Sequence, residues 1–219
     1  MNLTLKKNMP EDCLNNINQD TGRKSLIYEI IKLIFDYLFS VISLLIFSPF
    51  MILLALVIRI SGGGPVIYSQ DRIGKNGKPF SIYKFRSMVY SAESGEPLLS
   101  RDNEERVTKI GRIIRKYRID ELPNFLNVLK GEMSVVGPRP ERQFFIDQII
   151  REAPEYAFLQ NIKPGITSWG QVKYGYASSV KGMIERSCFD IHYLKQRSLW
   201  FDLKIILLTI GTVLRGKGI

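Results

Sequence analysis

The feature that most constrains this chain is an uncharged, apolar run from Tyr37 to Ile58. At about 1.5 Å per helical residue, the run is long enough to cross a bilayer core of about 30 Å. The alternative is a buried core helix, but uncharged runs longer than about 18 residues are rare in soluble domains. The run therefore predicts a helix in the membrane.

Two features bear on whether this helix crosses the bilayer. Pro49, near the middle of the run, lacks a backbone donor and tends to kink a helix. Lys24 and Lys32 precede the run and Arg59 follows it, so the positive-inside rule places both ends in the cytoplasm. We expect a re-entrant helical hairpin over residues 27 to 60. A kinked single span is the alternative, because proline is tolerated in spanning helices.

The rest of the chain divides into an extension and one domain. Residues 1 to 26 are polar without a sustained period, which predicts a weakly ordered N-terminal extension. Residues 61 to 219 are long enough to bury one substantial core. Cys13 and Cys188 match no zinc-ligand spacing and form no disulfide framework, so reduced thiols are expected. His192 is the single histidine, so acid, base or nucleophile chemistry falls mainly to carboxylates.

The net charge of +10 indicates anionic partners. Nucleic acid, acidic lipid and phosphorylated substrates all satisfy it, and charge alone does not choose among them. A non-catalytic basic membrane adaptor or a nucleic-acid binder is therefore the alternative to an enzyme.

Two extended segments flank the turn-forming residues Asn76 and Gly77, which predicts a β-hairpin. Lys84 and Arg86 lie two residues apart in the second segment, so both side chains share one face. There they would meet a phosphate, or form only a solvated strand face.

A basic amphipathic helix is predicted over residues 103 to 118. Val107, Ile110 and Ile114 lie on one helical stripe, and most of the basic residues lie elsewhere. Such a helix packs on the core or lies on anionic lipid, and composition does not separate the two. An apolar helix flanked by aromatic residues and lysines ends the chain.

The residues most suited to chemistry are the adjacent carboxylates Asp120 and Glu121, just before or within the first turn of a helix that Pro123 helps to start. Acidic residues at this place often serve only as caps. Arg115 and the proline-flanked Arg139 lie nearby in the sequence, however. A carboxylate that attacks a phosphoryl group needs its charge repulsion neutralised, and arginines, a helix N-terminus or a divalent metal can do this.

Three longer stretches of the sequence occur in this order: SPFMILLALVIRISGGGPVIYSQDRIGKNGKPFSIYKFRSM, RIDELPNFLNVLKGEMSVVGPRP and KPGITSWGQV. With these stretches, residues 27 to 219 resemble the small monotopic polyprenyl-phosphate phosphoglycosyl transferases of bacteria. Each short motif alone is weak, and the combination of the membrane Ser-Pro, KFRSM, DELP and GPRP carries the resemblance.

The resemblance implies a mostly helical α+β fold. A re-entrant membrane helical hairpin would precede a compact cytosolic catalytic domain over residues 61 to 219, with a small β-hairpin and amphipathic interfacial helices. The protein would lie at the cytoplasmic face of the bacterial inner membrane. Its implied partners are a UDP-sugar, undecaprenyl or another polyprenyl phosphate, anionic lipid and downstream glycosyltransferases, with no nucleic acid.

The resemblance also implies a mechanism. Asp120 would attack the UDP-sugar, expel UMP and hold the phosphosugar covalently, with Mg²⁺ assisting at Asp120. Glu121 would then help polyprenyl phosphate to attack this intermediate, giving a polyprenyl diphosphate sugar in a ping-pong cycle. This would be the first membrane step of glycoconjugate or surface polysaccharide synthesis. Substrate-binding roles are implied for Lys84, Arg86, Arg115, Arg139, Gln171 and Asp190.

Overall fold

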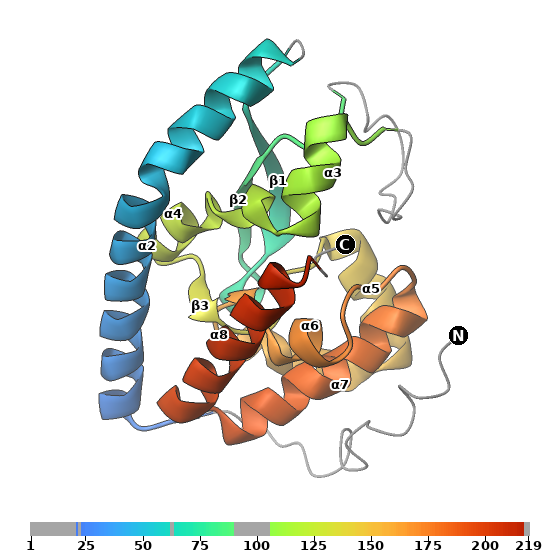
Figure 1. Cartoon of the computed structure of the whole chain (residues 1–219). Coiled ribbons are helices and arrows are strands. Elements are labelled where there is room, and N and C mark those ends of the chain that lie inside the picture. The colour runs from blue at the N-terminus through green and yellow to red at the C-terminus, as the bar shows by residue number, and fades with distance from the viewer. Residues whose placement is uncertain (1–20, 22, 62–63, 90–105, 217–219) are drawn as a thin grey trace.

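A long helix lies along one side of a mostly helical body (Figure 1). The computed structural model describes residues 21, 23–61, 64–89 and 106–216. Two small two-stranded sheets accompany the helices in this part of the chain. The expected mostly helical α+β class is confirmed at this level.

The long helix is α2 (Leu26–Ile60), whose bounds agree with the expected membrane helix. The Ser25 side chain caps it by accepting a hydrogen bond from the Tyr28 N–H. Pro49 lies inside α2, and Figure 1 shows the helix bending near its middle. The helix nevertheless runs on through Pro49 without folding back, so a helical hairpin is not confirmed.

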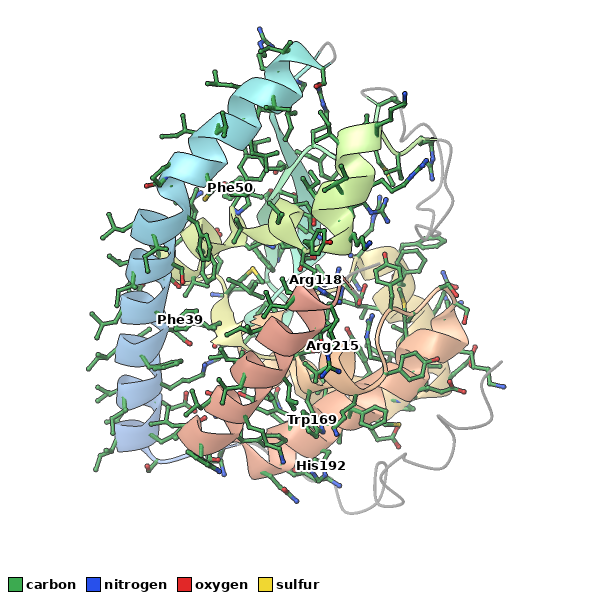
Figure 2. All side chains as sticks on the ribbon, viewed as in Figure 1. Phe39, Phe50, Arg118, Trp169, His192 and Arg215 are labelled. Atoms are coloured by element: carbon green, nitrogen blue, oxygen red, sulfur yellow. The ribbon has the colours of Figure 1, made fainter. Side chains whose placement is uncertain are left out.

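The two sides of α2 have different surroundings. Its outer side is an exposed apolar row that includes Leu26, Leu45 and Ile60, and Figure 2 shows side chains projecting away from the body along this side. Phe39, labelled in Figure 2, packs on Phe125 with ring centroids 6.1 Å apart. The inward side is buried along both halves of the helix, at Lys32, Asp36, Ser40, Ser43, Leu54 and Ile58.

A polar network fixes the first half of α2 to the body. The Lys32 ammonium lies 2.7 Å from an Asp36 oxygen and 3.1 Å from an oxygen of Asp202 on the last helix. Asp36 also accepts hydrogen bonds from the Ser134 hydroxyl (2.7 Å) and the Val135 N–H (3.2 Å). Because all of these charged groups are buried, the network specifies one position of α2 against the body.

The predicted hairpin is confirmed. β1 (Ile67–Ile73) and β2 (Pro79–Phe85) pair antiparallel around η1 (Lys75–Gly77), with Tyr68 opposite Lys84. Asn76 and Gly77 have φ values of 58° and 71°, the left-handed conformation that such turns require.

The segment after the hairpin carries the adjacent carboxylates Asp120 and Glu121, which we call the dyad. It consists of α3 (Lys109–Lys116), η2 (Ile119–Glu121) and α4 (Asn124–Leu129). α3 is shorter than the predicted helix over 103 to 118, whose first three residues lie outside the described residues. Its stripe is amphipathic as expected, because Ile114 is buried while Arg112 is exposed.

The GPRP and KPGIT motifs lie side by side. β3 (Ser134–Val136) pairs parallel with β4 (Gly165–Thr167). In the sequence, α5 (Gln143–Glu152) and η3 (Pro154–Asn161) lie between these two strands. A Cβ on Gly137 would lie 2.4 Å from the Lys163 carbonyl oxygen, and one on Gly165 would lie 2.1 Å from the Gly137 nitrogen. Only glycine allows the two backbones to approach this closely.

The last three helices close the body: α6 (Trp169–Lys173), α7 (Val180–Gln196) and α8 (Leu199–Leu214). α8 is the predicted apolar C-terminal helix, and it exposes Trp200 (77%) on its outer side. The main core joins these helices to α5 and the β3–β4 pair, through residues such as Ile149, Leu194 and Ile205. The expectation of two reduced thiols is wrong, because Cys188 is in a disulfide bond; Cys13 lies outside the described residues.

Candidate active site

The adjacent carboxylates lie in η2, the single 3₁₀ turn between α3 and α4. Asp120 and Glu121 are only 6% and 7% exposed. Pro123 takes the cap position of α4 and no side chain caps that helix, so neither carboxylate serves as its N-cap. The capping alternative is therefore unsupported, and two buried acids stand next to each other without a structural role in α4.

Three cations surround the Glu121 carboxylate. The Lys84 ammonium lies 2.6 Å from Oε1, and both terminal nitrogens of Arg139 lie 3.3 Å from the same oxygen. Arg118 approaches Oε2 at 3.6 Å. Burial alone would raise the pKa of Glu121, but these cations together hold it below its usual range. Glu121 is therefore a carboxylate at neutral pH.

Asp120 has a different environment. Its side chain makes no hydrogen bond or ion pair with another residue of the described part of the chain. Burial and the neighbouring Glu121 charge raise the pKa of Asp120 to about 6, against the lowering effect of Lys84, Arg115 and Arg118. Two adjacent carboxylates thus have pKa values moved in opposite directions, a pattern typical of acid, base or nucleophile pairs.

The predicted binding residues divide into those at the dyad and those elsewhere. Lys84 and Arg139 contact Glu121 directly. Arg115 is buried on α3, its charge acts on Asp120, and its Nη1 has no partner among the described residues. Arg86 instead donates to the Ile58 carbonyl oxygen at the end of α2, at 3.1 Å. Lys84 and Arg86 therefore contact different groups, and their joint contact with a phosphate stays a prediction.

Asp190 and Gln171 lie where α6 meets α7. Asp190 accepts hydrogen bonds from the Gly170 N–H (2.7 Å), the Ser168 hydroxyl and the Arg139 backbone N–H. It thereby connects α6 to the segment that carries Arg139. Burial nonetheless raises the pKa of Asp190 to about 6. The Gln171 side chain is 5% exposed, and neither its amide nitrogen nor its amide oxygen has a partner in the described structure.

Sequence reasoning missed Arg118 as a site residue and treated it as part of a basic surface. Arg118 has φ 52° and ψ 24°, a left-handed conformation that is uncommon outside glycine. This conformation separates α3 from η2 and lets Arg118 approach Glu121. A Cβ on Gly216, just after α8, would lie 2.6 Å from the Lys116 side chain and 3.4 Å from the Tyr117 ring. The end of α8 therefore covers the end of α3 beside the dyad.

Sequence reasoning also missed Glu141, whose ion pairs hold the segment that carries Arg139. Glu141 pairs with Arg186 of α7 and lies 3.5 Å from Arg72 of β1. The Glu141 carbonyl oxygen also accepts a hydrogen bond from the Ile73 N–H at 3.0 Å. The only signal in the sequence was the position of Glu141 directly after GPRP. These buried contacts connect the GPRP segment to both the hairpin and α7.

The dyad suits a metal that is completed by a substrate. No group of three or more His, Cys, Asp or Glu side chains placed to hold a metal occurs in the described ranges. Mg²⁺ commonly takes one or two carboxylates and fills its remaining positions with substrate phosphates and water. Asp120, which has no hydrogen-bond partner in the described structure, offers such a carboxylate oxygen.

Comparison with known proteins gives a family match over most of the chain. The family model for bacterial sugar transferases matches residues 27–216. This range begins with α2 and includes the dyad, GPRP and KPGIT.

Three curated relatives have similar sequences. The chain is 45% identical to a UDP-N-acetylgalactosamine-undecaprenyl-phosphate N-acetylgalactosaminephosphotransferase of Aeromonas hydrophila, over 89% of this chain and 46% of the relative. It is 39% identical to a UDP-glucose:undecaprenyl-phosphate glucose-1-phosphate transferase of Escherichia coli K12, over 80% of this chain and 38% of the relative. A relative of the same printed activity from Caulobacter vibrioides is 38% identical, over 84% and 69%. The chain thus spans less than half the length of the first two relatives.

Proposed function

This chain belongs to the bacterial sugar transferase family, and from that premise we propose that it transfers a sugar 1-phosphate from a UDP-sugar to undecaprenyl phosphate. The observation that carries the proposal is the pair of buried adjacent carboxylates with opposite pKa shifts, surrounded by Lys84, Arg115, Arg118 and Arg139. This arrangement combines a nucleophile with cations for a diphosphate.

The first half-reaction uses Asp120 as the nucleophile. One Asp120 oxygen forms a bond to the phosphorus that carries the sugar, while the bond from that phosphorus to the bridging oxygen breaks and UMP leaves with the electron pair. The nearby cations reduce the repulsion between the carboxylate and the phosphate. Mg²⁺ held by Asp120 and the diphosphate would neutralise further charge.

The second half-reaction regenerates the carboxylate. A phosphate oxygen of undecaprenyl phosphate bonds to the same phosphorus, and the bond to Asp120 breaks, which releases undecaprenyl diphosphate sugar. Glu121 stays ionised because of its three cations, so it can hold Lys84 and Arg139 in place for the attacking phosphate. Downstream glycosyltransferases would then extend the product in glycan synthesis.

UMP release tests the proposed function. The purified full-length protein is incubated with Mg²⁺, undecaprenyl phosphate and each member of a UDP-sugar panel, including the N-acetylgalactosamine and glucose forms. We expect stoichiometric UMP and lipid-linked sugar with at least one donor. A non-catalytic basic membrane adaptor, the competing function suggested by the +10 charge, would release no UMP from any donor.

The rate of the UMP burst should depend on pH through Asp120. The nucleophile must be deprotonated and its pKa is raised to about 6, so the burst rate should rise with pH and level off above about 7. Rapid-quench measurement of UMP at a series of pH values gives the midpoint. A midpoint close to the ordinary value of 3.8 would contradict the raised pKa. Asp190 also has a pKa of about 6, and the Asp190→Asn variant should keep the inflection if Asp120 causes it.

Arg139→Lys should reduce activity at least about tenfold, because lysine keeps the charge but cannot place two nitrogens on one anion. Arg139 does this now with Glu121, at 3.3 Å from each nitrogen. The measurement is steady-state UMP release, with Arg151→Lys on the exposed surface of α5 as the matched control. Activity equal to that of the control variant would remove Arg139 from substrate binding.

We further propose that α2 enters the membrane without crossing it, at the cytoplasmic face of the inner membrane. α2 is the one described helix long and apolar enough to span, but both of its halves are bound to the same body. Lys32 and Asp36 contact β3 and α8, whereas Ile58 contacts Arg86 after β2. If α2 crossed the bilayer, the polar body attached to either end would be drawn into hydrocarbon, where unsatisfied polar groups are costly.

Cysteine labelling tests this topology. In intact cells, Lys24→Cys and Ser61→Cys, placed at exposed positions on either side of α2, should both resist a membrane-impermeant maleimide. Both should react after permeabilisation. Cys188 is in a disulfide bond and should not react, and the unsubstituted chain gives the background labelling. Labelling of one end alone in intact cells would favour the kinked single span.

A further inference from the structure

A second basic site lies away from the dyad, in a cavity of about 410 Å³ between the first half of α2, β3 and the turn η1. None of the residues that line this cavity belongs to the Asp120, Glu121, Lys84 and Arg139 cluster. Its lining includes Ser134 and Val136 of β3, the strand that directly precedes the GPRP segment with Arg139.

The charges of this cavity are unbalanced. Its cations are Arg23, Lys24, Lys32, Lys75, Lys163 and Arg197, against only two carboxylates, Glu29 and Asp36. Both carboxylates are already engaged, because Asp36 pairs with Lys32 and Glu29 pairs with Arg197.

Lys75 and Lys163 are two of the four other cations that line the cavity. Their ammonium groups make no hydrogen bond or ion pair with any residue in the described part of the chain. Burial, together with the charges of Lys75 and Lys32, lowers the pKa of Lys163, although Asp36 opposes this. Ammonium groups are thus held near one another at some electrostatic cost, and an anion in the cavity would relieve it.

The cavity also adjoins the apolar surface of α2. Leu33 lines the cavity and belongs to the row of exposed apolar residues along that helix. A ligand could therefore place a charged group among the lysines while an acyl chain lies along α2. A water-soluble phosphate would use the charged part alone.

We propose that this cavity is a second anion site that binds a phosphate group, separate from the phosphates of the transfer reaction. Its recognition elements are the ammonium groups of Lys75 and Lys163, supported by Lys24 at the exposed edge. Lysine binds phosphate as a point charge, which suits either a lipid phosphodiester or inorganic phosphate. Binding in this cavity would stabilise the packing of α2 against β3.

Thermal unfolding of the full-length protein tests this site, because a ligand that binds only the folded state raises the midpoint. One arm compares inorganic phosphate with chloride at equal ionic strength in detergent. The other compares nanodiscs of phosphatidylcholine alone with nanodiscs that also contain phosphatidylglycerol. We expect the wild-type midpoint to rise in at least one arm, and the Lys75→Gln/Lys163→Gln variant to lose most of that rise. Lys181→Gln, on the exposed side of α7 outside the cavity, should keep it.

The arms distinguish the sources of the phosphate. A rise only with phosphatidylglycerol assigns the site to lipid, and a rise with inorganic phosphate in detergent shows that the headgroup chemistry suffices. Without either anion, the double variant should unfold at the same or a higher temperature, since it removes charges that repel. No rise in either arm overturns the proposal. A rise that the double variant keeps in full also overturns it and assigns the anion to the dyad.

Discussion

Asp120→Asn should lower turnover by at least about 1000-fold and prevent any phosphosugar adduct, because it removes the nucleophilic oxygen charge while keeping the side-chain shape. The protein should stay folded. The pKa of Asp120 is raised in the folded state, so its ionisation opposes folding progressively as the pH rises from the ordinary value of 3.8 to about 6, and fully above that. Replacing it with a neutral amide should therefore leave the unfolding midpoint at pH 7 unchanged or higher.

Intact-protein mass spectrometry after incubation with the UDP-sugar and Mg²⁺ measures the adduct, and UMP release measures turnover. Asp147→Asn, at an exposed position on α5, is the matched control and should keep both. An Asp120→Asn variant that turns over at a rate near that of the control would overturn the nucleophile assignment.

Glu121→Gln should have the opposite effect on stability, because it should destabilise the folded protein. It leaves Lys84, Arg118 and Arg139 around a neutral amide, and the loss of one partner from a buried ion cluster costs on the order of 3 kcal/mol. The pKa of Glu121 is lowered in the folded state, so its stabilising charge is fully present above the ordinary value of 4.5 and is lost as the pH falls below it. The deficit should accordingly be full at pH 7 and shrink below about pH 4.5.

Chemical denaturation at several pH values measures this loss, with Glu152→Gln on the surface of α5 as the control. Phosphate or UDP-sugar should restore part of the stability, because either supplies the missing anion. If Glu121 serves the second half-reaction, the folded variant should also release up to one equivalent of UMP and accumulate adduct. A variant with the stability and turnover of the control would remove Glu121 from both roles.

Local chemistry made several features predictable from the sequence. Asn76 and Gly77 specify the hairpin turn, the apolar run specifies α2, and Pro123 marks the start of α4 two residues after Glu121. Each of these depends on the conformational preferences of adjacent residues, which a single sequence carries.

Contacts between distant residues were not predictable in the same way. The period of β2 placed Lys84 and Arg86 together, yet Lys84 goes to Glu121 and Arg86 to the end of α2. Arg86 lies one residue past the end of β2, although its backbone N–H still donates to the Val66 carbonyl oxygen. The separation of the two side chains therefore follows from their distant partners. Arg118 reaches Glu121 because of a left-handed backbone conformation, which no residue type at that position signals.

The network around Lys32 and Asp36 has a consequence for the order of events during synthesis. These charged residues lie in the first helix of the described part of the chain, but Ser134 follows almost 100 residues later and Asp202 lies in α8. Until those partners are made, α2 carries two ionisable groups that would be costly to bury in lipid without them. We expect α2 to remain at the bilayer surface during translation and to insert to its final depth only after α8 has been synthesised.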